Sequence, residues 1–259
     1  IKSRWTDTAN KRLLGVKQGL DPAYVPTPAP AATAPTSNPA PGGTSSLPTS
    51  LRARFSAKSG VTKDASNNVT AWAGGTGLTA SPAEASKPTF AADGWASGVP
   101  ALVFGPTASL TTNVPNGPQT SDPLSIIAVF QSASTAMGEF IGSGHDGINL
   151  QINGSDYQIN AEYHTAISGT GPGGNPTAKR IILLRNIPGS NASRVRIDGA
   201  LLANFAGFPF EVFNYIYGRN PEGGTNWQGK LGVVSFAGGV TDAEAAAWEA
   251  FEMGHFPLS

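Results

Sequence analysis

Apolar residues in the body of the chain recur as short runs or in alternation, which are the two patterns of β-strands. Residues 126–130 and 181–184 are continuous apolar runs bounded by turn-forming residues. Residues 231–236 contain no proline and carry apolar side chains at both odd and even positions. Such segments are typical of strands that are covered on both faces. They predict the centre of a buried sheet.

One helix is predicted after the last of these strands. Thr241 and Glu244 have the Thr-x-x-Glu spacing of a capping box, in which each side chain bonds the backbone N–H of the other residue. Trp248 and Phe251 then share one helix face. Gly254 is expected to end the helix.

Short strands separated by turns are predicted over the rest of the chain from residue 51 onward. Further strand-like segments are residues 51–55, 69–72, 87–90 and 99–105. Three dipeptides tolerate positive φ at both central positions of a type I′ turn and so predict hairpins. They are Asp146-Gly147, Asn153-Gly154 and Asp198-Gly199.

The early strands in this order, together with the late strand and its capped helix, resemble concanavalin A-like, laminin-G-type domains. The resemblance covers residues 51–259. It implies an all-β fold, a two-sheet antiparallel jelly-roll sandwich with one short C-terminal helix. The matching motifs concern packing, so the resemblance implies little about function.

The composition divides the chain into two parts. Gly accounts for 32 and Pro for 21 of 259 residues, which favours many tight turns. Eight prolines fall between residues 22 and 48, where a chain with few backbone donors favours an extended form. We therefore predict an extended basic, then Pro-rich arm over residues 1–50 and a sandwich over residues 51–259.

The charge pattern argues against several partners. The chain carries 17 basic and 17 acidic side chains, so it has no overall signature for nucleic acid or a membrane surface. It contains no apolar run of about 18 residues and no cysteine. Residues 1–20 nevertheless hold five cations and one acid. They form either a solvated leader or a segment that docks onto an acidic partner surface.

Catalysis is not expected from the carboxylates. Retaining glycoside hydrolases need two carboxylates about 5 to 5.5 Å apart, and no Glu-x-Asp-x-Glu pattern occurs. Glu139, Glu211 and Glu222 stand alone, and Asp156 with Glu162 across a hairpin is the one pairing left open. The chain is therefore predicted not to be an enzyme.

No cofactor and no metal site are predicted. The three histidines, at positions 145, 164 and 255, are dispersed. Asp64 with Asn67 and Asn68, or Asp146 near Gly144, could offer oxygen ligands to Ca²⁺. Because Ca²⁺ takes six to eight such ligands, Asx turns explain these residues better.

Four aromatic residues are candidates for contact with a sugar, because exposed rings stack on pyranose rings. They are Trp95, Tyr157, Tyr163 and Trp227. For each of them, packing in the core or at the end of the sandwich is the favoured alternative.

The leading functional hypothesis is a non-catalytic structural protein of a virus particle, a bacteriophage capsid decoration or appendage protein located in the virion. It rests on analogy and on an arm that has no core of its own. Partners would be protein subunits of the assembly, bound through an arm whose candidate docking residues are Trp5, Lys11, Arg12, Leu13 and Leu14. The alternative is a lectin-like, polysaccharide-binding module of an extracellular or cell-surface protein, and a glycoside hydrolase comes third.

Overall fold

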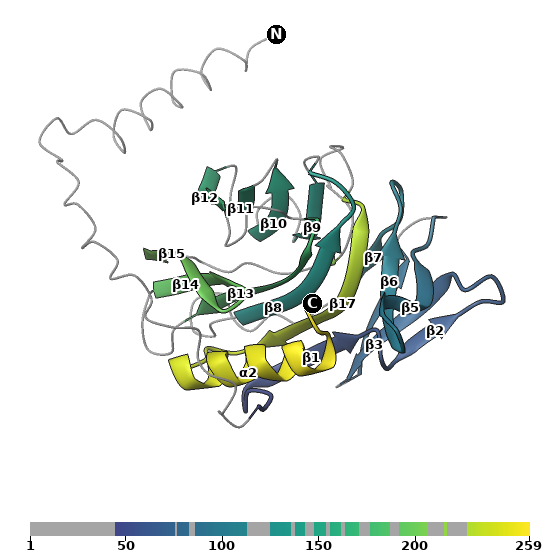
Figure 1. Ribbon diagram of the computed structural model, residues 1–259, viewed down its shortest axis with the longest axis horizontal. Helices are drawn as coiled ribbons and strands as arrows, with labels where there is room; N and C mark the ends of the chain where they lie inside the picture. Colours follow the sequence, from purple (N-terminus) through teal and green to yellow (C-terminus); the bar gives the residue numbers. More distant parts are fainter. Residues whose placement is uncertain are drawn as a thin grey trace, which may run out of the picture. The chain divides into compact units, whose positions relative to one another are not determined.

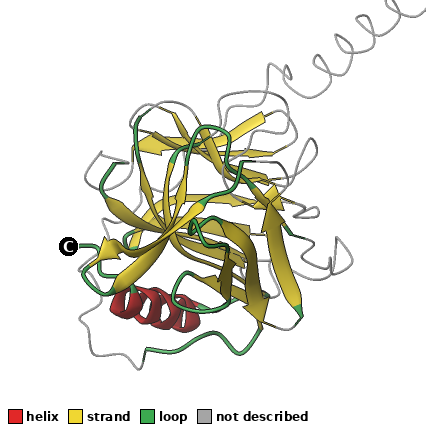
Figure 2. Cartoon of the chain, turned by 90° about the vertical axis from the view of Figure 1, so that its right-hand side faces the viewer, coloured by secondary structure: helices red, strands yellow, loops and turns green. Residues whose placement is uncertain are grey.

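The residues that the computed structural model describes all belong to one unit of the chain, residues 37–259. The described residues are 45–75, 77–82, 86–112, 125–135, 138–142, 148–153, 156–161, 164–170, 177–186, 192–206, 215–216 and 227–259. Two antiparallel sheets form layers in this unit, and one helix covers part of the outer face of a sheet (Figure 1 and Figure 2). The predicted all-β jelly-roll sandwich with a short C-terminal helix is confirmed.

The first sheet has eight strands. Its order is β15 (Ala200–Ala206), β14 (Ala192–Ile197), β13 (Lys179–Asn186), β8 (Ser125–Ser132), β17 (Gly229–Ala237), β6 (Val99–Phe104) and β5 (Thr89–Ala96), and β1 (Leu51–Ser56) also pairs with β17. Strands β6 and β1 share one edge of β17, because β6 pairs with its first residues and β1 with the rest. Strand β17 is therefore the centre of the layer, as predicted.

The second sheet has nine strands. Its order is β12 (His164–Thr170), β11 (Asp156–Ala161), β10 (Ile148–Asn153), β9 (Gly138–Gly142), β16 (Tyr215–Ile216), β7 (Leu110–Thr111), β4 (Leu78–Pro82), β3 (Val69–Gly75) and β2 (Val61–Lys63). All of its pairings are antiparallel. Its inner face packs on the inner face of the first sheet, as in other β-sandwiches.

Aromatic rings join the two sheets. Phe55 of β1 lies edge-on to Trp72 of β3 with ring centroids 5.7 Å apart, and Phe236 of β17 lies 6.3 Å from Phe55. The indole N–H of Trp72 donates to the carbonyl of Ser56 at 2.9 Å, so the buried ring leaves no polar group unpaired. A side chain at Gly74 would meet the Phe55 ring at 2.5 Å, which explains a glycine there.

Helix α2 (Asp242–His255) begins with the predicted capping box. Thr241 Oγ1 accepts the backbone N–H of Glu244 at 3.2 Å, and Glu244 Oε2 accepts the backbone N–H of Thr241 at 2.9 Å. Both bonds satisfy amides that the first turn of a helix leaves without a partner. The predicted start of the helix is confirmed.

The end of the helix differs from the prediction. Gly254 does not stop it, because α2 continues to His255 and the N–H of Phe256 still donates to Glu252 O at 2.8 Å. Gly254 does not have positive φ, so it cannot act as a left-handed cap. Among the described residues, no helix is long and apolar enough to cross a membrane.

Helix α2 packs on the outer face of the eight-stranded sheet (Figure 1). Trp248 is fully buried under it, and Phe251 is half-buried with the Arg54 guanidinium 5.4 Å from its ring centroid. Ser235 of β17 donates to Glu252 Oε1 at 3.4 Å. The sheet face away from the core is thus covered along β17, which explains why this strand is apolar on both faces.

Two predicted hairpins are present. Ile197 pairs with Ala200, and Asp198 and Gly199 between them have φ of 50° and 79°, as a type I′ turn requires. Strands β10 and β11 pair up to Asn153 and Asp156, so they also form a hairpin. The turn residues 154–155, and the predicted Asp146-Gly147 turn, lie outside the described residues.

The chain already contacts the sandwich before residue 51. The N–H of Ser46 donates to Ala247 O of α2 at 3.3 Å, and the N–H of Gly238 donates to Ser50 O at 3.0 Å. Leu47 packs against the hydrophobic core. Residues 46–50 therefore contribute contacts to the body, while the predicted division at residue 50 remains a prediction.

Candidate functional site

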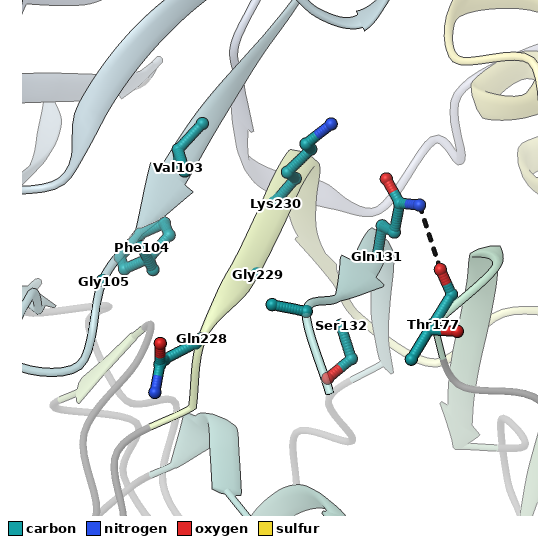
Figure 3. Close-up of a pocket in the computed structure, with 10 residues that line it drawn as sticks. Val103, Phe104, Gly105, Gln131, Ser132, Thr177, Gln228, Gly229 and Lys230 are labelled. Atoms are coloured by element: carbon teal, nitrogen blue, oxygen red, sulfur yellow. Dashed lines mark hydrogen bonds between the residues drawn. The ribbon is translucent and has the colours of Figure 1, made fainter. Parts of the chain in front are cut away.

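A pocket of about 490 Å³ lies at one end of the eight-stranded sheet (Figure 3). Four strand termini meet there, because β6 ends at Phe104 and β8 at Ser132, while β17 begins at Gly229 and β13 at Lys179. Antiparallel pairing sets these termini side by side. Small-molecule sites typically have volumes of roughly 300 to 1,000 Å³, so the pocket has the size of a ligand site.

Polar groups of several kinds line the pocket. They are the amides of Gln131 and Gln228, the hydroxyls of Ser132 and Thr177, and the ammonium group of Lys230. Together they offer both donors and acceptors. None of the described residues that line this pocket is an Asp, a Glu or a His.

Strand register aligns part of this lining in one row. Lys230 lies opposite Val103 on one side and opposite Gln131 on the other, and Gln131 lies opposite Lys179. Directly opposed residues project from the same face of a sheet, with neighbouring strands about 4.7 to 4.9 Å apart. Figure 3 shows the Lys230 and Gln131 side chains rising side by side from adjacent strands.

Hydrogen bonds hold the pocket rim. Gln131 Nε2 donates to Thr177 O at 2.9 Å, as the dashed line in Figure 3 marks. Ser132 Oγ donates to Ser134 O at 2.6 Å, and the N–H of Ala133 donates to Gln228 O at 2.8 Å. The bond to Thr177 fixes the orientation of the Gln131 amide. Its Oε1 is thereby left to act as an acceptor.

Lys230 differs from the other cations of the described region. It is half-buried. None of the ion pairs, side-chain hydrogen bonds or cation–π contacts among the described residues includes its ammonium group. By contrast, Lys179 donates to Ser259 O at 3.1 Å and Lys87 lies 3.7 Å from Asp64. The ammonium group of Lys230 is therefore available to an anion that enters the pocket.

A second pocket, of about 560 Å³, adjoins the first. Val103 and Gly105 line both of them. Thr89, which lies opposite Val103 on β5, and Lys87 extend the polar lining into the second pocket. The two pockets therefore lie next to each other across the ends of β5, β6, β17 and β8.

The predicted sugar-contact tryptophans are packing residues. Trp95 is 3% exposed, donates its indole N–H to Pro257 O at 2.9 Å and lies edge-on to Phe256. Trp227 is 1% exposed and packs on Phe104 with ring centroids 5.9 Å apart. Because both rings are buried, neither offers a face to a sugar in this structure.

The other sequence candidates are residues or side chains outside the described part of the structure. Tyr163, and the arm residues Trp5, Lys11, Arg12, Leu13 and Leu14, lie outside the described residues. Tyr157 belongs to β11, and its side chain is outside the described part of the structure. Of the possible carboxylate pair, Asp156 belongs to β11 but its side chain is outside the described part, and Glu162 lies outside the described residues. Their predicted roles stay predictions.

The loop of Asp64, Asn67 and Asn68 forms an Asx turn, as expected. Asp64 Oδ1 accepts the N–H of Ser66 and the N–H of Asn68, each at 2.9 Å, and Oδ2 accepts Asn68 Nδ2 at 3.1 Å. The side-chain and backbone bonds from Asn68 lower the pKa of Asp64, although its exposure to solvent limits their effect. No group of three metal-ligating side chains occurs within the described residues.

Sequence comparisons return nothing for this chain. No family model matches it, and no curated protein matches it. Membership of the laminin-G-type family is thus not shown.

Solved structures share the fold. Trypanosoma rangeli sialidase in complex with sialic acid matches with a TM-score of 0.58 and 14% identity over 86% of this chain and 36% of the sialidase. The botulinum neurotoxin serotype D binding domain matches with a TM-score of 0.54 and 10% identity over 78% of this chain and 51% of that chain. The chain therefore spans about a third of the sialidase and half of the toxin domain. At such identities the likeness shows the β-sandwich fold alone.

Sequence reasoning missed the residues of the pocket. Lys230 carries the one charge within β17, and Gln131 directly follows the apolar run of β8. Both were visible as polar residues at strand ends. Their meeting was not visible, because it depends on the register of strands that are about 100 residues apart in sequence.

Proposed function

We propose that this chain is a saccharide-binding module and that the pocket of Figure 3 is its binding site. The observation that carries the proposal is the polar lining of a pocket of ligand size, to which two amides, two hydroxyls and one ammonium group belong. Sugar hydroxyls both donate and accept hydrogen bonds, and so do amide and hydroxyl side chains.

The fold supports this proposal. Similar structures include a sialidase solved with sialic acid and the binding domain of a neurotoxin. Such a module would act at an extracellular or cell surface that meets glycans. This assignment develops the lectin-like alternative of the sequence analysis.

Recognition in this pocket would depend on hydrogen bonds instead of stacking. The one aromatic residue that lines it in the described region is Phe104, which is 2% exposed and packs on Trp227. Polar pockets of this kind select ligands by the placement of donors and acceptors, and a missing partner is costly.

We propose binding instead of catalysis. Among the described residues, neither pocket is lined by a carboxylate or an imidazole. The buried carboxylates Glu249 and Glu252 belong to α2, where they pair with Arg196 and Arg54. The site thus offers no described general acid or base for cleavage of a glycosidic bond.

The virion hypothesis remains a separate prediction. It rests on the arm over residues 1–50 and on docking through Trp5, Lys11, Arg12, Leu13 and Leu14, whose placement lies outside the described residues. Nothing in the comparisons bears on capsid or appendage partners. An arm that attaches to an assembly would be compatible with a sandwich that binds glycans.

The test is a glycan array followed by titration calorimetry on the best ligand. Gln228→Ala removes an exposed amide from the pocket, and Gln131→Ala removes the oriented one. Each variant should weaken binding by about tenfold, the effect of roughly one hydrogen bond in a polar site. Thr62→Ala, an exposed residue on β2, is the control and should leave affinity unchanged. A wild-type chain that binds no glycan would disprove the function.

A further inference from the structure

The inference concerns the chemistry of the sugar, and it rests on the proposed function. Lys230 is half-buried, lines the pocket and has no anionic partner among the described residues. Elsewhere in the described region each buried or half-buried arginine or lysine at the sheet surface has a partner, such as Arg180 with Asp198 or Arg196 with Glu249. Lys230 is therefore the exception to the charge pairing of this sheet.

Neighbouring residues do not explain the exception. On its two sides Lys230 faces Val103 and Gln131, of which one is apolar and the other is neutral. The nearest cation along the same row, Lys179, is two strands away and is engaged by Ser259 O and the Trp95 ring. No carboxylate of the described residues lines the pocket. An anion bound beside Lys230 would meet positive charge and no opposing acid.

The adjoining pocket adds length to the site. It continues from Val103 and Gly105 towards Thr89 and Lys87. Lys87 already lies 3.7 Å from Asp64, so its charge is partly compensated. The first pocket is thus the charged part of the site, and the second is the more neutral part.

We propose that the ligand is an acidic saccharide whose carboxylate pairs with Lys230, while an adjacent sugar unit extends past Val103 and Gly105 into the second pocket. A charge-assisted hydrogen bond between an ammonium group and a carboxylate is stronger than a neutral one. The proposal requires no covalent step and no cofactor.

Acidic sugars and their uncharged methyl esters test whether the carboxylate of the ligand contributes to binding. The probes are α-methyl N-acetylneuraminate and methyl galacturonoside, each with its uncharged methyl ester, measured by calorimetry at low and moderate salt. At least one acid should bind about tenfold more tightly than its ester, and the gain should shrink as salt screens the pair. Which acid prevails identifies the sugar type. Lys230→Gln should remove the preference, and Lys230→Arg should keep it. Lys58→Gln, which removes an exposed charge outside both pockets, is the control.

The length of the saccharide tests whether the second pocket takes part in binding. A galacturonate trimer should bind more tightly than the monomer, and Thr89→Ala should weaken the trimer alone. Equal binding of acid and ester, or a preference that survives Lys230→Gln, would overturn the acidic ligand and leave saccharide binding intact. Failure of every saccharide, acidic or neutral, would overturn the proposed function together with this inference.

Discussion

Glu249 Oε2 lies 2.9 Å from Arg196 Nη2 between helix α2 and strand β14, while Glu249 Oε1 is buried without a hydrogen-bond partner. Burial raises the pKa of Glu249 to about 7. The charge of Arg196 and its hydrogen bond oppose this rise, and the nearby Asp198 adds to it. Burial prevails because only one of the two carboxylate oxygens is paired.

The raised pKa predicts a pH dependence of stability. The folded chain holds the Glu249 proton to a higher pH than the unfolded chain, whose carboxyl titrates near 4.5. The stabilisation from this group is therefore complete below about pH 4.5 and is lost as the pH rises through about 7. In Glu249→Gln, the decline in unfolding free energy over this range should flatten, as denaturant titrations at a series of pH values would show.

Glu244→Gln is the matched control for this experiment. The backbone hydrogen bond to Thr241 lowers the pKa of Glu244, so its stabilisation is present above the usual carboxyl pKa and is lost as the pH falls. Glu244→Gln should therefore change the unfolding free energy only at acidic pH. If both variants changed the unfolding free energy over the same pH range, the decline between about pH 4.5 and 7 would not be due to Glu249.

Trp248 should anchor α2 to the sheet. Its side chain is fully buried, and truncation of a buried aromatic typically costs about 3 to 5 kcal/mol. Trp248→Ala should therefore lower the melting temperature by roughly 10 °C, since about 1 kcal/mol corresponds to 2 to 4 °C in a chain of this size. Trp248→Phe keeps most of the apolar volume and should cost less. Equal melting temperatures for wild type and Trp248→Ala would show that the helix contributes little.

Removal of one partner of the Arg54–Glu252 ion pair should lower the free energy of unfolding more than removal of both. Arg54 Nε and Nη2 donate to Glu252 Oε1 and Oε2 at 2.9 and 2.7 Å, and Glu252 is fully buried. Arg54→Leu leaves this carboxylate with Ser235 alone and should cost about 3 kcal/mol. Adding Glu252→Leu should recover much of the loss, because no unpaired charge remains. Chemical denaturation of the single and double variants measures this coupling; a double variant less stable than either single would contradict it.

The first contacts of the sandwich begin before residue 51. A chain that starts at residue 45 keeps the bond from Ser46 to Ala247, the packing of Leu47 and the bond to Ser50. It should fold with a cooperative transition close to that of the full chain. A chain that starts at residue 51 loses all three contacts and should melt at a lower temperature. Identical transitions for the two truncated chains would show that residues 45–50 add no stability.

Local features of the fold were predictable from the sequence. The capping box at Thr241 and the turn at Asp198 depend on residues a few positions apart, and both are present as expected. The continuous apolar run of residues 126–130 likewise predicted a strand covered on both faces. The prediction that Gly254 ends the helix is wrong, because a glycine acts as a left-handed cap only where the backbone takes positive φ.

The candidate site was not predictable in the same way. Val103, Gln131 and Lys230 are far apart in sequence, and they form a row only because β6, β17 and β8 pair in one register. A shift of one residue would turn Lys230 to the core face. Trp95 and Trp227 were candidates by residue type, yet packing around them decides their exposure.

The proposed saccharide site lies at the ends of β6, β8 and β17. The most direct measurement is an NMR titration of the isotope-labelled full chain with the best saccharide from the array. The chemical shifts of the backbone amides report where the saccharide binds. Binding at this site should concentrate the shifts at Gly105, Ser132 and Gly229, which line the pocket. In Gln131→Ala the same shifts should require about tenfold more saccharide, in line with its weaker binding. Shifts that cluster on strands β10 to β12, with the pocket resonances unmoved, would contradict binding at this site.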